Sequence, residues 1–170
     1  MWLYENDYDN KVRYILGIEG TRPLFCVGIN PSTAEPGSLD RTLQSVQRHA
    51  YSAGFDSWIM FNVYPQRATF PDDLHLEIDP ILHEKNMKWI EDYLGRYETP
   101  TIWAAWGTLI EKRAYLRNCL SDMVKIANGR NAQWVQFGAP SKKGHPHHPL
   151  YLRNDALPSP FAPLTNCIDV

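Results

Sequence analysis

The chain has 170 residues, of which 44% are hydrophobic and 21% charged. This composition fits one globular domain over residues 1–170 rather than two, and leads us to expect no disordered tail. No run approaches the roughly 18 uninterrupted apolar residues of a membrane span, and the first ten residues are acidic where a signal peptide is basic, so we expect a cytoplasmic protein with no membrane partner. Residues 1–110 carry nine basic side chains against fifteen acidic ones, whereas residues 111–170 carry eight against four, and this basic C-terminal third is either a surface for a polyanion or a solvated face.

Short, continuous runs of apolar, β-branched and aromatic residues are typical of buried strands. Along this chain they alternate with helical patterns, an order that favours a mostly parallel sheet covered by helices. We therefore expect an α/β fold, a three-layer α/β/α sandwich with a central sheet of four to five strands. The strands are expected at residues 24–29, 58–61, 101–106 and 133–137, and residues 12–16 are the candidate for a fifth, at the edge.

Three helices are predicted between these strands. The first covers residues 40–53, with apolar side chains on one face. The second begins at the N-cap Asp79, which precedes a proline, and stops at Gly95. The third is expected to begin at Thr108, because Thr108 and Glu111 have the spacing of a capping box.

Polar segments follow three of the predicted strands, at residues 28–33, 62–67 and 144–149. In open α/β sheets, ligands bind beyond the carboxyl ends of the strands. The three segments are therefore expected to converge on one site at that edge of the sheet.

Two asparagines stand out at these strand ends. Asn30 precedes a proline that holds it extended, and Gly28 lets the backbone approach a ligand; the alternative is an ordinary turn. Asn62 ends an apolar strand and carries a donor and an acceptor together, which suits the Watson–Crick edge of a base. As an alternative, Asn62 caps the loop that follows it.

Three histidines, His145, His147 and His148, lie between prolines after the last predicted strand. A histidine can donate a hydrogen bond to a developing oxyanion near neutral pH. The alternatives are exposed loop residues or adventitious metal binding. We predict no native metal site and no cofactor, because no nearby residue completes a ligand set and the three cysteines are widely spaced.

The order of these motifs resembles that of the uracil-DNA glycosylase superfamily over most of the chain. The segments that carry this resemblance are Gly-Ile-Asn-Pro (residues 28–31), Asn62, Ile-Trp-Ala-Ala-Trp-Gly (residues 102–107), and His145-Pro146 with Pro149-Leu150. The chain looks more closely similar to an uncharacterised bacterial and phage domain family that carries a domain-of-unknown-function label. The segments that carry this closer resemblance include Gly-Ile-Asn-Pro-Ser-Thr-Ala (residues 28–34) and Gly-His-Pro-His-His-Pro-Leu-Tyr-Leu (residues 144–152).

The resemblance to glycosylases implies a uracil-DNA-glycosylase-like fold and a role for each matching residue. Asn30 would position the attacking water, Asn62 would read the extruded base, and His145 would support the negative charge that grows on the base oxygen. The residues implied to wedge into the duplex are Leu150 and Tyr151, and those implied to clamp phosphates are Lys142, Lys143 and Arg153.

Other positions depart from the glycosylase pattern. Ser32 and Thr33 stand where glycosylases often carry a shielding aromatic, and their hydroxyls suit phosphate or sugar contacts. The remaining candidates for substrate binding, carried by the segments that resemble the uncharacterised family, are Gly28, Asp40, Arg41, Arg67 and His148.

The leading hypothesis is a glycosylase-like protein that acts on or recognises a nucleobase in nucleic acid, with hydrolysis of the N-glycosidic bond as its reaction. Two alternatives stay open. One is a non-catalytic module that binds nucleic acid or a modified base, and the other is an enzyme of nucleotide or base modification in phage-linked metabolism. Nucleic acid or a nucleotide is the expected partner in each case.

Overall fold

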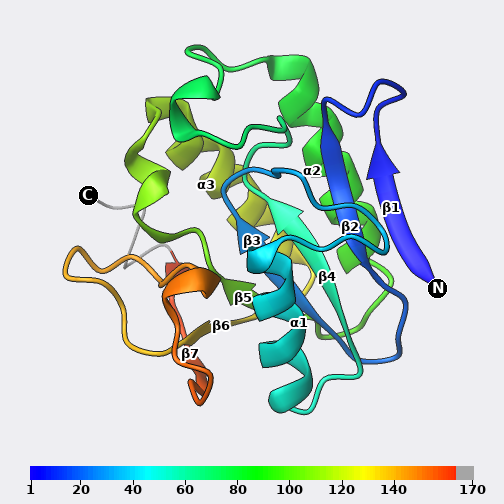
Figure 1. The fold of residues 1–170 in the computed structure, drawn as a ribbon, viewed down its shortest axis with the longest axis vertical. Helices are drawn as coiled ribbons and strands as arrows, with labels where there is room; N and C mark the ends of the chain where they lie inside the picture. The colour runs from blue at the N-terminus through cyan, green and yellow to red at the C-terminus, as the bar shows by residue number, and fades with distance from the viewer. Residues whose placement is uncertain (164–170) are drawn as a thin grey trace.

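The computed structural model describes residues 1–163. Within this part of the chain, seven strands form one mixed sheet in the order β1-β2-β4-β3-β5-β6-β7, and three α-helices cover it (Figure 1). The strands are β1 (Trp2–Asn6), β2 (Arg13–Ile18), β3 (Pro23–Gly28), β4 (Ser57–Asn62), β5 (Thr101–Ala104), β6 (Gln133–Phe137) and β7 (Pro158–Pro160). The helices are α1 (Arg41–Ser52), α2 (Pro80–Leu94) and α3 (Ala114–Gly129), with short 3₁₀ helices η1 (Pro71–Asp73), η2 (Gly107–Glu111) and η3 (Pro149–Tyr151).

The four predicted buried strands are confirmed as β3, β4, β5 and β6, and they run parallel. The predicted edge strand is confirmed as β2, which pairs antiparallel with β4. The expected size of the sheet, four to five strands, is wrong, because β1 and β7 add further antiparallel strands at its two edges. β7 reads Pro-Ser-Pro, which has no strand propensity of its own, and proline is tolerated only at such an edge.

Side chains from the sheet enter two separate hydrophobic cores, one on each face. Phe25 and Val27 pack in the core that includes α2 and α3, whereas Leu24 and Cys26 pack in the core that includes α1. This alternation follows from the two-residue period of a strand. The general α/β prediction, with helices on both faces of the sheet, is therefore confirmed.

The first two predicted helices are confirmed, the second with its predicted N-cap Asp79. The Asp40 side chain accepts a hydrogen bond from Leu43 N (2.9 Å) at the start of α1, and Asp79 caps α2 in the same way. The predicted start of the third helix at Thr108 is wrong. Gly107 has a positive φ of 61° and leads into η2, so α3 begins only after Arg113.

The connections after the parallel strands leave toward opposite faces of the sheet. The chain after β3 leads to α1 on one face, and the chains after β4 and β5 lead to α2 and α3 on the other (Figure 1). Where neighbouring connections diverge in this way, a crevice opens beyond the carboxyl ends of the strands. Among residues 1–163, no helix is long and apolar enough to cross a membrane.

Candidate functional site

A cavity of about 650 Å³ lies beyond the carboxyl ends of the parallel strands. Its walls come from the loops after β3, β4 and β5, from the first turn of α1, and from the loop around η3. The three polar segments singled out in the sequence therefore converge. The predicted site residues that line the cavity are Gly28, Asn30, Ser32, Asp40, Arg41, Asn62, His148, Leu150 and Tyr151.

Asn62 contributes a buried carboxamide to the cavity wall. Its side chain is 1% exposed, and neither its Nδ2 nor its Oδ1 has a hydrogen-bond partner among the described residues. The backbone of Asn62 is fixed, because Asn86 Nδ2 of α2 donates to its carbonyl oxygen (2.9 Å). Leaving a buried donor or acceptor unpaired costs about 1–3 kcal/mol. An adjacent ligand that offers both complementary groups would recover that free energy.

The side chain of Asn30 is oriented by its surroundings. Its Nδ2 donates to the carbonyl oxygens of Pro31 (3.0 Å) and Ala68 (2.8 Å). Its Oδ1 accepts no hydrogen bond from the described residues, and Asn30 lines the cavity. The side chain therefore presents a fixed acceptor to whatever occupies the cavity, such as a water molecule.

His148 is held as a neutral imidazole with a defined tautomer. Its Nδ1 accepts a hydrogen bond from Leu150 N (3.2 Å), which leaves the ring proton on Nε2. Burial lowers the pKa of His148 below its ordinary value, and the nearby Asp40 carboxylate opposes this shift. The residue lines the cavity, and its Nε2–H is a neutral hydrogen-bond donor.

His145 is not brought into the cavity wall. It is buried, its Nε2 lies 3.7 Å from Glu111 Oε1, and its Nδ1 has no hydrogen-bond partner within the described part of the chain. Its backbone is fastened by Ser141, whose Oγ accepts from His145 N (3.1 Å) and whose N–H donates to His145 O (2.8 Å). The imidazole therefore lies beside Glu111 of η2.

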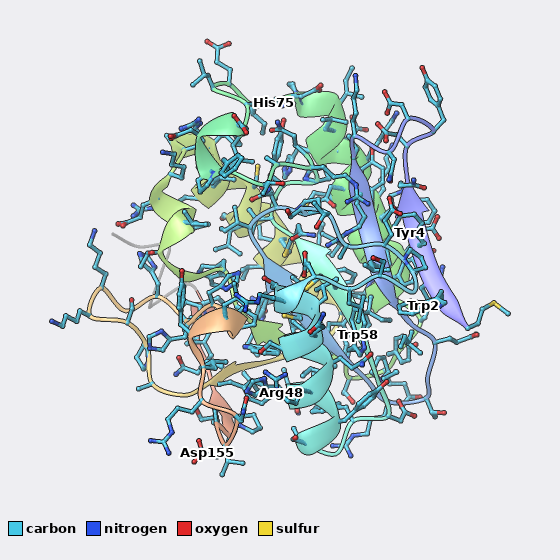
Figure 2. All side chains as sticks on the ribbon, in the orientation of Figure 1. Trp2, Tyr4, Arg48, Trp58, His75 and Asp155 are labelled. Carbon is cyan, nitrogen blue, oxygen red and sulfur yellow. The ribbon has the colours of Figure 1, made fainter. Side chains whose placement is uncertain are left out.

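Arg67 and Thr33 also lie outside the cavity wall. Arg67 holds the loop after β3, because it donates to the carbonyl oxygens of Ser32 and Ala34 and to the hydroxyl of Tyr4 (2.6 Å). Tyr4 lies on β1 (Figure 2), so this arginine ties two loops to the edge of the sheet. Thr33 is exposed.

The three residues expected to clamp phosphates do not line the cavity, and two of them are already engaged. Lys143 Nζ lies 3.1 Å from Glu111 Oε2, and Arg153 Nε lies 3.1 Å from Asp155 Oδ1. Lys142 is exposed. Because the two ion pairs partly neutralise these charges, the loop offers less positive charge than its sequence suggests.

Arg13 is a site residue that the sequence interpretation missed. It begins β2, is only 2% exposed, and lines the cavity. A charged residue inside an otherwise apolar strand was the available signal, since a buried charge needs a partner or a ligand. His147, Thr108 and Ser141 also line the cavity without having been assigned a role there.

Among residues 1–163, no group of three or more His, Cys, Asp or Glu residues could hold a metal ion. Cys26 and Cys119 are free and buried, and burial raises the pKa of both thiols. Cys167 lies outside the described residues.

Fold and site together define an α/β protein with a ligand-sized cavity at the carboxyl edge of its parallel strands. The family model described as "Protein of unknown function (DUF1643)" matches residues 13–150. The chain therefore belongs to this family, which confirms the expected membership of a domain family of unknown function. The match runs from Arg13 to Leu150, both of which line the cavity. No curated protein and no solved structure matches the chain.

Proposed function

We propose that the cavity binds a nucleobase and that the protein is a glycosylase-like enzyme that hydrolyses the bond between this base and its sugar. The observation that carries the proposal is the buried carboxamide of Asn62, which has no hydrogen-bond partner in the part of the chain that the structure describes. A carboxamide offers one acceptor and two donors in a plane. The edge of a nucleobase offers the complementary pair, so a base beside Asn62 would satisfy both polar atoms at once.

The size and walls of the cavity support a planar heterocycle. A volume of about 650 Å³ lies within the usual range for small-molecule sites. Met60, Trp106 and Leu109 add apolar wall to the polar groups. Leu150 and Tyr151, at 47% and 79% exposed, stand at the surface, where they could contact a nucleic-acid strand from which the base is extruded.

His148 and Asn30 supply the groups that the proposed hydrolysis needs. The bond from the anomeric carbon to the base nitrogen breaks, and its electron pair leaves with the base. The Nε2–H of His148 donates to the base oxygen on which this charge gathers. Asn30 Oδ1 accepts from a water molecule, whose oxygen bonds to the anomeric carbon while one of its protons passes to the departing base.

This arrangement predicts a slow enzyme. Asparagine cannot act as a general base, so it orients water without deprotonating it. The reaction therefore depends on a base that leaves easily and on the oxyanion donor, which is typically worth about 10²–10³ in rate.

To test this, the protein is incubated with oligonucleotides that carry uracil, mismatches or modified pyrimidines. Base release is then detected by cleaving the strands at abasic sites. We expect base release that falls by about 10²–10³ in His148→Ala and is lost in Asn30→Ala. The matched control is Thr33→Ala, which removes an exposed side chain outside the cavity wall and should leave release unchanged.

The alternatives give different results in the same assay. Tight binding without release, reduced by Asn62→Leu, would favour a non-catalytic module for a modified base. Turnover of free nucleotides with no action on any oligonucleotide would favour an enzyme of nucleotide modification. Loss of release in Thr33→Ala to the same extent as in His148→Ala would contradict the assignment of this cavity.

A further inference from the structure

Arg13 is a buried cation that makes few hydrogen bonds. Its Nη1 donates to Ala34 O (3.1 Å), and its Nε is buried with no hydrogen bond to any of residues 1–163. Among the described residues, no carboxylate lies within ion-pair distance of this guanidinium. A guanidinium carries five N–H donors. Most of its donors are therefore left for something other than protein.

The charges around Arg13 do not balance. Arg67 lies close enough to lower the pKa of Arg13, and Arg41 lines the same cavity. Among the described residues of that wall, the only acidic side chain is Asp40, whose charge raises the pKa of Arg13. Desolvation, the largest effect, and Arg67 outweigh the opposing effects of Asp40 and Tyr4 and lower the pKa of Arg13 to about 10, so it remains a cation at neutral pH. One carboxylate thus accompanies three guanidinium groups, and because buried charges are normally paired, this corner of the cavity suits an anion.

The first turn of α1 adds backbone donors to the same corner. The Asp40 side chain caps the helix by accepting from Leu43 N, and its carbonyl accepts from Gln44 N. The N–H groups of Arg41 and Thr42 come before any intrahelical partner, and both residues line the cavity. A helix N-terminus with free N–H groups favours a negatively charged ligand.

The sheet places this corner beside Asn62. β2 runs antiparallel to β4 with Leu16 opposite Met60, so Arg13 at the start of β2 lies near the end of β4. Arg13 N also donates to Pro65 O (3.0 Å), in the loop that follows Asn62. An anion at Arg13 and a base at Asn62 would thus occupy one cavity.

We infer that Arg13 and the first-turn amides of α1 form a binding site for a phosphate group, and that the ligand of this protein is a nucleotide held by its base and its phosphate. The part that concerns the base rests on the function proposed above, whereas the anion site rests on Arg13 and α1 alone. The phosphate is either the monoester of a free nucleotide or a diester of a nucleic-acid strand.

The test compares ligands that differ only in the phosphate. Calorimetric titration with uridine, cytidine, adenosine and guanosine, with their 5′-monophosphates and with inorganic phosphate gives the dissociation constants. We expect the monophosphate of the preferred base to bind about tenfold or more tightly than its nucleoside. In Arg13→Gln this difference should vanish, with the nucleoside affinity unchanged.

Two controls isolate the proposed contacts. Arg22→Gln removes an exposed arginine that lies over the Phe55 ring, and it should leave the difference between nucleoside and monophosphate intact. If Arg13→Gln does not fold, the comparison of Arg41→Pro with Arg41→Ala tests the site instead. Both variants lack the Arg41 side chain, but only the proline variant also lacks the amide N–H. Proline is tolerated at this first helical position. Monophosphate binding weaker in the proline variant than in the alanine variant supports the site.

The outcomes separate the two proposals. Equal binding of nucleoside and monophosphate to the wild-type protein would overturn the phosphate site and leave base recognition standing. Binding of inorganic phosphate that depends on Arg13, with no nucleoside bound, would support the anion site and overturn base recognition. No binding of any of these ligands, nor of a single strand, would overturn both.

The same titration with a five-nucleotide single strand identifies the source of the phosphate. A strand that binds more tightly than the monophosphate, with affinity that falls steeply as salt rises, supports a diester ligand. A monophosphate that binds more tightly than the strand supports a free nucleotide. If Arg13→Gln weakens the binding of neither the monophosphate nor the strand, the phosphate site is overturned.

Discussion

Gly28 of β3 pairs with Asn62 of β4 at the parallel ends of their strands, and a Cβ on residue 28 would lie 3.2 Å from Asn62 Oδ1 and 2.8 Å from Met60 Cε. The absence of a side chain at Gly28 therefore sets the space that the Asn62 carboxamide occupies. The thioether end of Met60 is flexible and can move aside, whereas the Asn62 side chain has little room to do so.

The first prediction is that Gly28→Ala lowers ligand affinity strongly while the protein stays folded, because the new methyl group displaces the Asn62 carboxamide. The matched control is Gly129→Ala at the end of α3, where a Cβ would meet nothing within 4 Å. That control should keep full affinity and gain about 0.5–1 kcal/mol of stability. Calorimetric titration and chemical denaturation measure the two effects, and an unchanged affinity in Gly28→Ala would contradict the role of Asn62.

The second prediction is that Asn62→Leu abolishes base binding and stabilises the protein. Both polar atoms of Asn62 are buried without partners in residues 1–163, so replacing them with apolar atoms of similar shape removes a desolvation cost. We expect the free energy of unfolding to rise by about 1–3 kcal/mol. Denaturant titration checks this, and a loss of stability would show that Asn62 serves the fold.

The third prediction concerns pH. Burial lowers the pKa of His148 in the folded protein below its ordinary value of 6.5, so the unfolded chain binds more protons in the window between the two values. The free energy of unfolding should therefore rise with pH through that window and reach its full value above 6.5. Melting temperatures across the window, compared with those of His148→Asn, measure the slope. The asparagine can still accept from Leu150 N, and its slope should be flatter.

The fourth prediction concerns the attachment of η3 to α1. Ser45 Oγ donates to Pro149 O (2.9 Å), and the two groups are buried. Ser45→Ala should lower the free energy of unfolding by about 1 kcal/mol and should speed amide hydrogen exchange around η3, which also carries the Leu150 N–H that orients His148. Ser52→Ala at the exposed end of α1 is the control, and equal exchange in both variants would argue against this attachment.

The predictable part of the fold is the part that local sequence controls. The apolar run that became β3 is continuous enough to indicate a strand buried on both faces, and the Asp79-Pro80 start of α2 carries its own cap. β7 could not be predicted, because Pro-Ser-Pro becomes a strand only through pairing with β6. The Thr108–Glu111 spacing predicted the wrong helix start, because Gly107 has a positive φ and a 3₁₀ helix forms there.

The site could be predicted where strand ends define it and not where loop packing does. Asn30 and Asn62 follow from the rule that parallel strands share a carboxyl edge. Which of His145 and His148 lines the cavity depends on the contacts of His145 with Ser141 and Glu111, and no local sequence pattern encodes these contacts. Arg13 enters the cavity only because β2 pairs with β4.

The walls of the cavity come from positions as far apart in the chain as Arg13 and Tyr151. No contiguous fragment holds the whole wall, so a ligand gains its contacts only when the entire sheet is assembled. Occupancy then protects the complete fold against unfolding, by about 2.7 kcal/mol at a free concentration one hundred times the dissociation constant. A thermal-shift screen of small molecules is for this reason a direct route to the natural ligand.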